Sequence, residues 1–304
     1  MTLHQFLDVV EIRTKRVSLG AIVVGVLLAG WRYQRVATVP TVLLAITAVL
    51  LDMGTTGFNS FFDHFRGADH VTTNRESDKR IVRGEVAPGV VLLLALGLYA
   101  LAGISGLVLV AQVGWWLLPV GLGAALVGVC YSAGPLPISS TPAGELFAGG
   151  TLGTLLVALV AGMTPGAIDR INVLAALPSG LIVASILTVN NTCDMEVDRA
   201  AGRLTLSLVI GKPAARVVVP LLGVAASAAA IVLALPGVVL PRAVAASAVC
   251  GLLWALPLYR RMAHNGYSAA SKSIQMGSIA RVFTRFTLAL AVGLAVAIVV
   301  RAWG

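Results

Sequence analysis

Two polar segments, each at the end of a long apolar run, carry residue types that suit metal-bound phosphate chemistry. In the first segment, Asn59 and Asp63 stand four residues apart, and Asp69 follows Gly67. Residues spaced by four share one face of a helix. We expect Gly67 to let the chain leave the helix and Asp69 to fold back toward Asp63. Carboxylate and amide oxygens suit a hard cation such as Mg²⁺, which readily shares phosphate ligands.

Two other interpretations of the first segment stay open. His64 and His70 neighbour the acids, so a zinc or iron site is one alternative, although His64 points roughly 100° away from Asp63 on a helix. The other alternative is a charged helix end whose groups are satisfied by water and Arg66.

The second polar segment repeats the pattern 131 residues later, where Asn190, Asp194 and Asp198 are each four residues apart. The spacing predicts that all three lie on one helical face, with Arg199 and Arg203 on the neighbouring stripe. Three oxygen ligands beside two guanidinium groups would hold a metal-bridged diphosphate. A solvated helix end explains this segment equally well by itself. The pairing of the two segments favours the diphosphate site.

Asp52 lies inside an apolar run, seven residues before Asn59 and two helical turns along the same face. An acid near the centre of a membrane helix costs about 2.5–3.5 kcal/mol on insertion scales, which makes it a functional candidate. Asp52 either contacts an acceptor substrate or is a protonated acid bonded to a neighbouring Ser or Thr.

The composition predicts that these residues are positioned by membrane helices. The 304 residues are 58% hydrophobic and only 12% charged, against about 25% charged in soluble domains. We expect an all-α polytopic membrane protein, one domain over residues 1–304, whose helices surround a central cavity. Nine segments approach the roughly 20 apolar residues that a span needs, at 17–36, 38–63, 87–112, 114–132, 143–164, 172–193, 214–236, 240–259 and 277–302.

The distribution of positive charge predicts the orientation. With nine spans, most of the 22 Lys and Arg residues fall on the side of the N-terminus, which the positive-inside rule places in the cytoplasm. Both polar segments then face the cytoplasmic side of the cell (inner) membrane, with 64–86 and 194–213 as loops over the site. Residues 1–16 are expected to lie along the membrane surface as an interfacial helix, the alternative being a frayed terminus. The net charge of +9 requires no nucleic-acid partner, because anionic headgroups or a phosphorylated substrate would meet these loops.

Several stretches resemble the UbiA superfamily of intramembrane prenyltransferases. The first segment, N-x3-D-x5-D with Gly two before the last Asp, is most similar to the 1,4-dihydroxy-2-naphthoate prenyltransferase branch, the menaquinone pathway enzymes. So are residues 80–88 (RIVRGEVAP), 131–137 (YSAGPLP) and 194–206 (DMEVDRAAGRLTL). Two positions depart from the pattern: Ser60 stands where relatives commonly have Asp, and Asp52 where many have an amide.

The resemblance implies a two-metal site. Asp63 and Asp69 would hold one Mg²⁺ and Asp194 and Asp198 a second, both bridging the diphosphate of an allylic polyprenyl donor. The remaining implied roles are assistance to the metals by Asn59 and Asn190, charge balance by Arg80, Arg199 and Arg203, contact of Tyr131 with the reacting carbon or the acceptor, and tentative acceptor contact by Asp52.

The implied reaction transfers the prenyl group to 1,4-dihydroxy-2-naphthoate with loss of CO₂, giving a demethylmenaquinone. Alternatives that keep the donor site are transfer to a hydroxybenzoate or a glyceryl lipid, and membrane terpene cyclisation. A cation-coupled transporter is disfavoured because the acids lie at one face and not near the bilayer midplane. The small residues Gly149, Gly150, Gly153 and Gly223 either let helices approach closely or leave room for a long isoprenoid.

Overall fold

The structure, a computed structural model, describes residues 1–66, 81 and 83–303. All regular elements among these residues are helices, which confirms the all-α part of the predicted fold class. The predictions for Asp69 and Arg80, and most of the expected 64–86 loop, lie outside the described residues.

The helices follow one another along the chain with short connections. In order they are α1 (Leu3–Val9), η1 (Ile12–Lys15), α2 (Arg16–Tyr33), α3 (Thr38–Phe65), α4 (Pro88–Val113), α5 (Leu117–Cys130), η2 (Ile138–Ser140), α6 (Gly144–Ala148), the π-helix η3 (Gly149–Leu155), α7 (Leu156–Gly162), α8 (Arg170–Cys193), α9 (Met195–Ala200), α10 (Leu206–Ala234), α11 (Arg242–Asn265) and α12 (Lys272–Trp303).

Local sequence explains several helix ends. Pro88 opens α4, where its missing N–H is not needed. The Asp169 side chain caps α8 by accepting a hydrogen bond from the Asn172 backbone N–H at 2.7 Å. Gly266, at φ 67°, follows the last residue of α11 and turns the chain toward α12.

All nine predicted spans correspond to helical segments, but fewer meet the criteria for a membrane span. Seven helical stretches of the described chain are long and apolar enough to cross a bilayer: α3, α4, the stretch Gly144–Gly162, α8, α10, α11 and α12. The predicted span at 114–132 contains only the shorter apolar helix Leu117–Cys130. The predicted span at 17–36 corresponds to α2, which is not among the seven.

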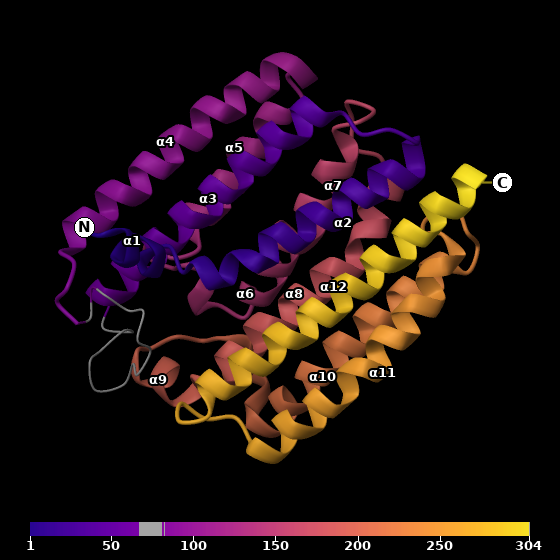
Figure 1. Cartoon of the computed structure of the whole chain (residues 1–304). Coiled ribbons are helices and arrows are strands. Elements are labelled where there is room, and N and C mark those ends of the chain that lie inside the picture. Colours follow the sequence, from indigo (N-terminus) through magenta and orange to yellow (C-terminus); the bar gives the residue numbers. More distant parts are fainter. Residues whose placement is uncertain (67–80, 82, 304) are drawn as a thin grey trace.

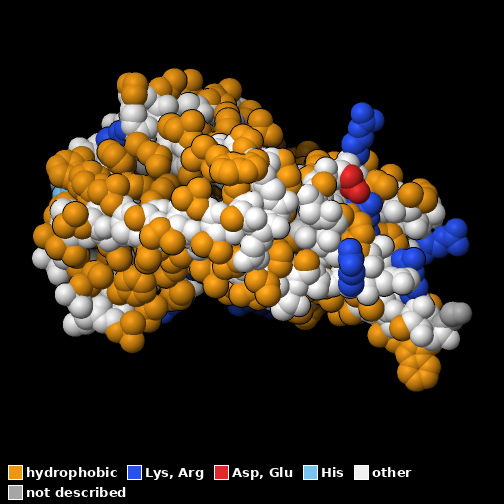
Figure 2. Space-filling model, turned by 90° about the horizontal axis from the view of Figure 1, so that it is seen from above, with side chains coloured by type: hydrophobic (Ala, Val, Ile, Leu, Met, Phe, Trp, Pro, Cys, Tyr) orange, Lys and Arg blue, Asp and Glu red, His pale blue; other side chains and the backbone are white. Residues whose placement is uncertain are grey.

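The long helices pack side by side as one bundle (Figure 1). α3 packs along α4, α10 along α8, and α11 along α12, while α2 contacts both α7 and α12. Figure 1 shows the N- and C-termini at opposite ends of the bundle. The outer surface is apolar: Leu93 is 70% exposed and Ile104 63% exposed. Figure 2 shows one side of the molecule covered largely by hydrophobic side chains, with charged side chains toward one end. Such a surface fits a protein embedded in lipid.

Two stretches outside the nine predicted spans contain short helices. Residues 1–16 include α1, whose Thr2 and Gln5 form a reciprocal capping box, and η1. The 194–213 segment, expected as a loop, holds α9 and the first residues of α10. Gly202, at φ 71°, separates these two helices, and Thr205 precedes α10.

Most of the small residues singled out above serve close packing. A Cβ atom on Gly149 would lie 2.5 Å from the Gly180 carbonyl oxygen of α8, and one on Gly153 would lie 2.5 Å from the Gly180 Cα. A Cβ on Gly223 would lie 1.7 Å from the Tyr259 hydroxyl oxygen. These three positions therefore bring helices together, whereas Gly150 has no atom within 4 Å of such a Cβ.

Candidate active site

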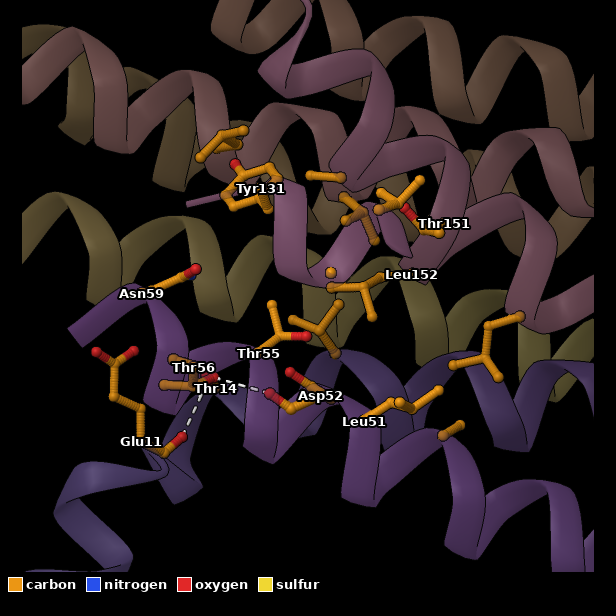
Figure 3. Close-up of a pocket in the computed structure, with 18 of the residues that line it drawn as sticks. Glu11, Thr14, Leu51, Asp52, Thr55, Thr56, Asn59, Tyr131, Thr151 and Leu152 are labelled. Carbon is orange, nitrogen blue, oxygen red and sulfur yellow. Dashed lines mark hydrogen bonds between the residues drawn. The ribbon is translucent and has the colours of Figure 1, made fainter. Parts of the chain in front are cut away.

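One large cavity, of about 1150 Å³, reaches both polar segments. Asn59 and Asp63 line it from α3, and Asn190, Asp194 and Asp198 line it from the end of α8 and from α9. Figure 3 shows Asp52, Thr55 and Asn59 on α3 and Tyr131 opposite them around this space. The sequence prediction that the two segments meet at one cavity therefore agrees with the geometry.

Arg203 joins the two segments directly. Its Nη2 donates to Asp63 Oδ1 at 2.6 Å, and its Nη1 donates to Asp198 Oδ1 at 3.2 Å. The three side chains are largely buried, with 17% of Arg203, 18% of Asp63 and 4% of Asp198 exposed. A guanidinium group with five fixed donors is suited to bridging two carboxylates in this way. Helix ends far apart in the sequence are thus held together at the cavity.

Asp194 has a basic partner that the sequence did not predict. Lys272, the first residue of α12, donates from Nζ to Asp194 Oδ2 at 2.8 Å. Lys272 also lines the cavity, as do Ser273, Met276 and Phe283 further along α12. Lys272 is 78 residues from Asp194 in the sequence. The local sequence contains one hint of a special role for Lys272: it lies in the first turn of a helix, where acidic residues are favoured.

The second segment does not form one uninterrupted helix. α8 ends at Cys193, Asp194 has φ −93° and ψ 4°, and α9 begins at Met195. The spacing of four still holds in the backbone, because Asp194 N donates to Asn190 O at 3.0 Å and Asp198 N donates to Asp194 O at 2.8 Å. The break leaves Asn190, Asp194 and Asp198 on the cavity together.

The turn that follows α5 ties both segments to Tyr131. Tyr131 lines the cavity, and Ser132 donates from Oγ to Asn59 Oδ1 of the first segment. Arg66, just after α3, donates to the carbonyl oxygens of Ser132 and Gly134. Leu204 N donates to Ser140 O at 2.9 Å, which attaches the chain beside Arg203 to the end of the same turn.

Asp198 is the most deeply buried of the predicted ligands, with 3% of the residue exposed. Burial raises the pKa of this carboxyl to about 6, Arg203 opposes the rise and Asp194 adds to it. Its Oδ2 atom is buried and makes no hydrogen bond within the described structure. An unsatisfied buried carboxylate oxygen of this kind fits a site completed by a cation.

Arg199 occupies a different position from the other predicted site residues. It is exposed on α9 and is not among the residues that line the cavity. Its neighbours Asp198 and Arg203 do line it.

Asp52 lines the cavity but is also held by an ion pair. Lys15, only 2% exposed, donates from Nζ to Asp52 Oδ1 at 2.6 Å, to Asp52 O at 3.2 Å and to Thr56 Oγ1 at 2.7 Å. Ser18 donates to the second carboxylate oxygen. The neighbouring hydroxyl expected for a buried acid is present, and the lysine from the end of η1 is an addition that the sequence did not predict.

A second buried polar pair lies behind the site. Asn191 lines the cavity and donates from Nδ2 to Glu145 Oε1 at 2.9 Å. Glu145 is 4% exposed, and this bond fixes the orientation of the Asn191 amide.

The rest of the cavity wall is apolar and rich in small residues. Gly103 and Gly106 on α4 and Gly121 on α5 line it, together with leucines from several helices. A Cβ atom on Gly103 or Gly121 would meet no atom within 4 Å. These glycines of α4 and α5 therefore leave open space at the cavity wall, whereas Gly149 and Gly153 of η3 pack against α8.

The described residues contain no group of three or more His, Cys, Asp or Glu side chains arranged to hold a metal. Asp63, Asp194 and Asp198 are instead held by Arg203 and Lys272, and Asp69 is outside the described part. The donor atoms at this end of the cavity are nonetheless carboxylate and amide oxygens, the set that Mg²⁺ prefers. With the unpartnered Asp198 oxygen, these residues fit a magnesium site.

Comparison with known proteins identifies the family of this chain. Residues 18–280 match the UbiA prenyltransferase family. The chain is 31% identical over 198 residues to a 1,4-dihydroxy-2-naphthoate octaprenyltransferase of Bacillus subtilis (strain 168), a match that covers 65% of this chain and 63% of that protein. It is 28% identical over 200 residues to the protein of the same name from Mycobacterium tuberculosis (strain ATCC 25618 / H37Rv), covering 66% of this chain and 67% of that one.

Solved structures share the fold. A UbiA homolog from Archaeoglobus fulgidus bound to DMAPP and Mg²⁺ superposes with a TM-score of 0.66 at 15% identity, covering 96% of this chain and 99% of that one. A digeranylgeranylglyceryl phosphate synthase superposes with a TM-score of 0.62 at 18% identity, covering 96% and 98%. With a family match over residues 18–280, and with residues of both acidic segments on one cavity, this chain belongs to the UbiA prenyltransferase family.

Proposed function

We propose that this prenyl-transferring enzyme moves a polyprenyl group from an allylic diphosphate to 1,4-dihydroxy-2-naphthoate, with loss of CO₂. The observation that carries the donor half is the bridge from Asp63 through Arg203 to Asp198, which unites two acidic segments at the end of an apolar cavity. The acceptor half is supported by the names of the Bacillus and Mycobacterium relatives.

The residues around the cavity would have different roles in binding and activating the donor. Asp63, Asp69, Asp194 and Asp198, assisted by Asn59 and Asn190, would hold two Mg²⁺ ions, which when bound neutralise the diphosphate as its charge develops. Arg203, which lines the cavity, would offset the negative charge that develops on the leaving diphosphate, together with Arg80. Arg199, exposed on α9 and outside the cavity lining, could assist only after its side chain reorients. Tyr131, which lines the cavity, would face the reacting carbon or the acceptor.

The proposed reaction breaks the allylic C–O bond of the donor and replaces the bond between the ring and the carboxylate of the acceptor by a new C–C bond. The allylic C–O bond breaks with its electron pair on the diphosphate, and the apolar walls keep water from the resulting cation. The ring carbon that bears the carboxylate forms the new C–C bond. CO₂ then leaves and returns its electron pair to the ring, which gives the quinol form of a demethylmenaquinone.

The membrane arrangement is part of the proposal. One domain with nine spans, counting α2 and α5, places the N-terminus in the cytoplasm and the acidic end of the cavity at the cytoplasmic face of the inner membrane. Residues 1–16 lie along that face.

The test supplies purified protein with Mg²⁺, prenyl diphosphates of several lengths and three acceptors: 1,4-dihydroxy-2-naphthoate, 4-hydroxybenzoate and a glyceryl phosphate. Mass spectrometry should detect the naphthoate product without its carboxylate, and EDTA should abolish it. The doubly substituted variant Asp63→Asn/Asp194→Asn is the inactive control. A product that keeps the carboxylate, or turnover with another acceptor only, would refute the assignment.

A further inference from the structure

Lys272 belongs to no motif, yet it reaches the centre of the candidate site. It begins α12, lines the cavity and donates to Asp194 at 2.8 Å. A lysine here stands at the positive end of the helix dipole, where a cation is disfavoured. A broken local rule of this kind is expected at functional positions.

The backbone around Lys272 is built to hold it in place. Ser268 N donates to Ser271 Oγ at 3.0 Å, and Ser271 N donates to Ser268 Oγ at 3.3 Å. Gln275, one turn into α12 and fully buried, donates from Nε2 to Met262 O at 2.8 Å. These bonds fix the turn on both sides of Lys272, so its side chain starts from a defined point.

The ion pairs around the site follow one pattern. Arg203 holds Asp63 and Asp198, and Lys272 holds Asp194, so basic groups sit against the carboxylates proposed to bind metal. The buried Asp198 Oδ2 atom has no hydrogen-bond partner among the described residues. Two protein cations therefore face three carboxylates, and the Asp198 Oδ2 atom keeps its capacity to coordinate a metal.

We propose that Lys272 belongs to the site that binds the prenyl diphosphate and that it exchanges partners there. In the empty enzyme it pairs with Asp194. When the metal binds Asp194, Lys272 releases that carboxylate and pairs with the diphosphate. The inference rests on the proposed function. A divalent ion at Asp194 and the ammonium group repel each other, and the diphosphate offers Lys272 a new anion at the start of α12. Lys272 therefore weakens metal binding at Asp194 and strengthens diphosphate binding.

This double role gives Lys272→Met opposite effects on two ligands. Without diphosphate, Mn²⁺ should bind about tenfold more tightly, because Asp194 loses a charge-assisted hydrogen bond. At saturating Mn²⁺, the unreactive analogue geranyl thiodiphosphate should bind about tenfold more weakly, because the same kind of bond to the ligand is lost. Lys272→Arg should restore analogue binding.

The experiment titrates Mn²⁺ by electron paramagnetic resonance and the analogue by equilibrium dialysis, with full-length protein in detergent. Lys212→Met is the matched control, because Lys212 lies on α10 and is not among the cavity-lining residues. Lys272→Gln provides a second variant, and thermal unfolding confirms that each variant is folded.

Opposite shifts in the two affinities for Lys272→Met and Lys272→Gln, with none for Lys212→Met, support the exchange. Unchanged affinities, or shifts in the same direction, would overturn it while leaving the proposed function intact. If the wild-type protein shows no Mn²⁺-dependent binding of the analogue, the donor site itself is wrong and the exchange falls with it.

Discussion

The ion pair between Lys15 and Asp52 gives the sharpest test of how the N-terminal segment is attached. Lys15 is 2% exposed and the Asp52 side chain 12% exposed, so the ammonium group is shielded from water, whereas the carboxylate also borders the cavity. Removing one member of a buried pair typically costs about 3–5 kcal/mol, because the other charge is left without compensation.

The contacts of Lys15 and Asp52 rank the expected losses in the free energy of unfolding for the single and double variants. Asp52→Leu leaves the Lys15 ammonium with only a carbonyl oxygen and the Thr56 hydroxyl, so we expect the full cost of about 3–5 kcal/mol. Lys15→Met leaves Asp52 with the Ser18 hydrogen bond and with the cavity beside it, so we expect about 2–3 kcal/mol. The double variant removes both charges and should lie within about 2 kcal/mol of the wild type, as apolar replacements of buried pairs often do.

The measurement is the free energy of unfolding in mixed detergent micelles for the wild type, both single variants and the double variant. The expected coupling energy exceeds about 2 kcal/mol. Additive effects would refute the buried-pair interpretation. So would a stable Asp52→Asn variant whose only defect is a raised KM for the acceptor, since that result assigns Asp52 to acceptor binding.

Three further predictions concern the site, a helix contact and a helix cap. Asp63→Asn should lower kcat at least about 100-fold while the protein stays folded, because the amide still accepts from Arg203 but carries no charge; near-normal turnover would contradict the metal role. Gly153→Ala should destabilise by about 1–3 kcal/mol through its clash with α8, whereas Gly150→Ala, with open space around its Cβ, should be neutral or stabilising; equal unfolding free energies for the two variants would contradict the packing. At the start of α8, Arg32 holds the pKa of Asp169 below its usual value, so its contribution to stability is present above the unfolded pKa of about 3.9 and is lost as pH falls. Asp169→Asn keeps the cap but should flatten the acid dependence of the unfolding temperature between pH 5 and pH 3; an unchanged slope would contradict it.

The fold class and the spacing within each acidic segment were predictable because both depend on local pattern. The meeting of the two segments at one site was predicted from their position on the same membrane face and from the family resemblance. Apolar length identified the helices, and spacings of four placed Asn59 with Asp63 and Asn190 with Asp194. The interruption at Asp194 was not predictable from that spacing, because the backbone bonds on either side keep the same period through the break.

The basic partners were harder to predict because they come from distant parts of the chain. Lys15 meets Asp52 across 37 residues and Lys272 meets Asp194 across 78. Sequence periodicity describes one helix at a time, and these pairs depend on how three-dimensional packing brings helices together. Arg203 was predicted to balance phosphate charge, but its bridge between two carboxylates required the coordinates.

The glycines that line the cavity from α4 and α5 make its size easy to alter. Gly103 and Gly121 present only hydrogen atoms to the space, and an added Cβ would meet no neighbour. Replacement of either glycine by alanine, a single base change in the gene, would therefore reduce the space by the bulk of one methyl group and leave Asp63, Asp194 and Asp198 unchanged. Under the proposed function, the length of the prenyl group that fits would then vary independently of the acidic end of the cavity.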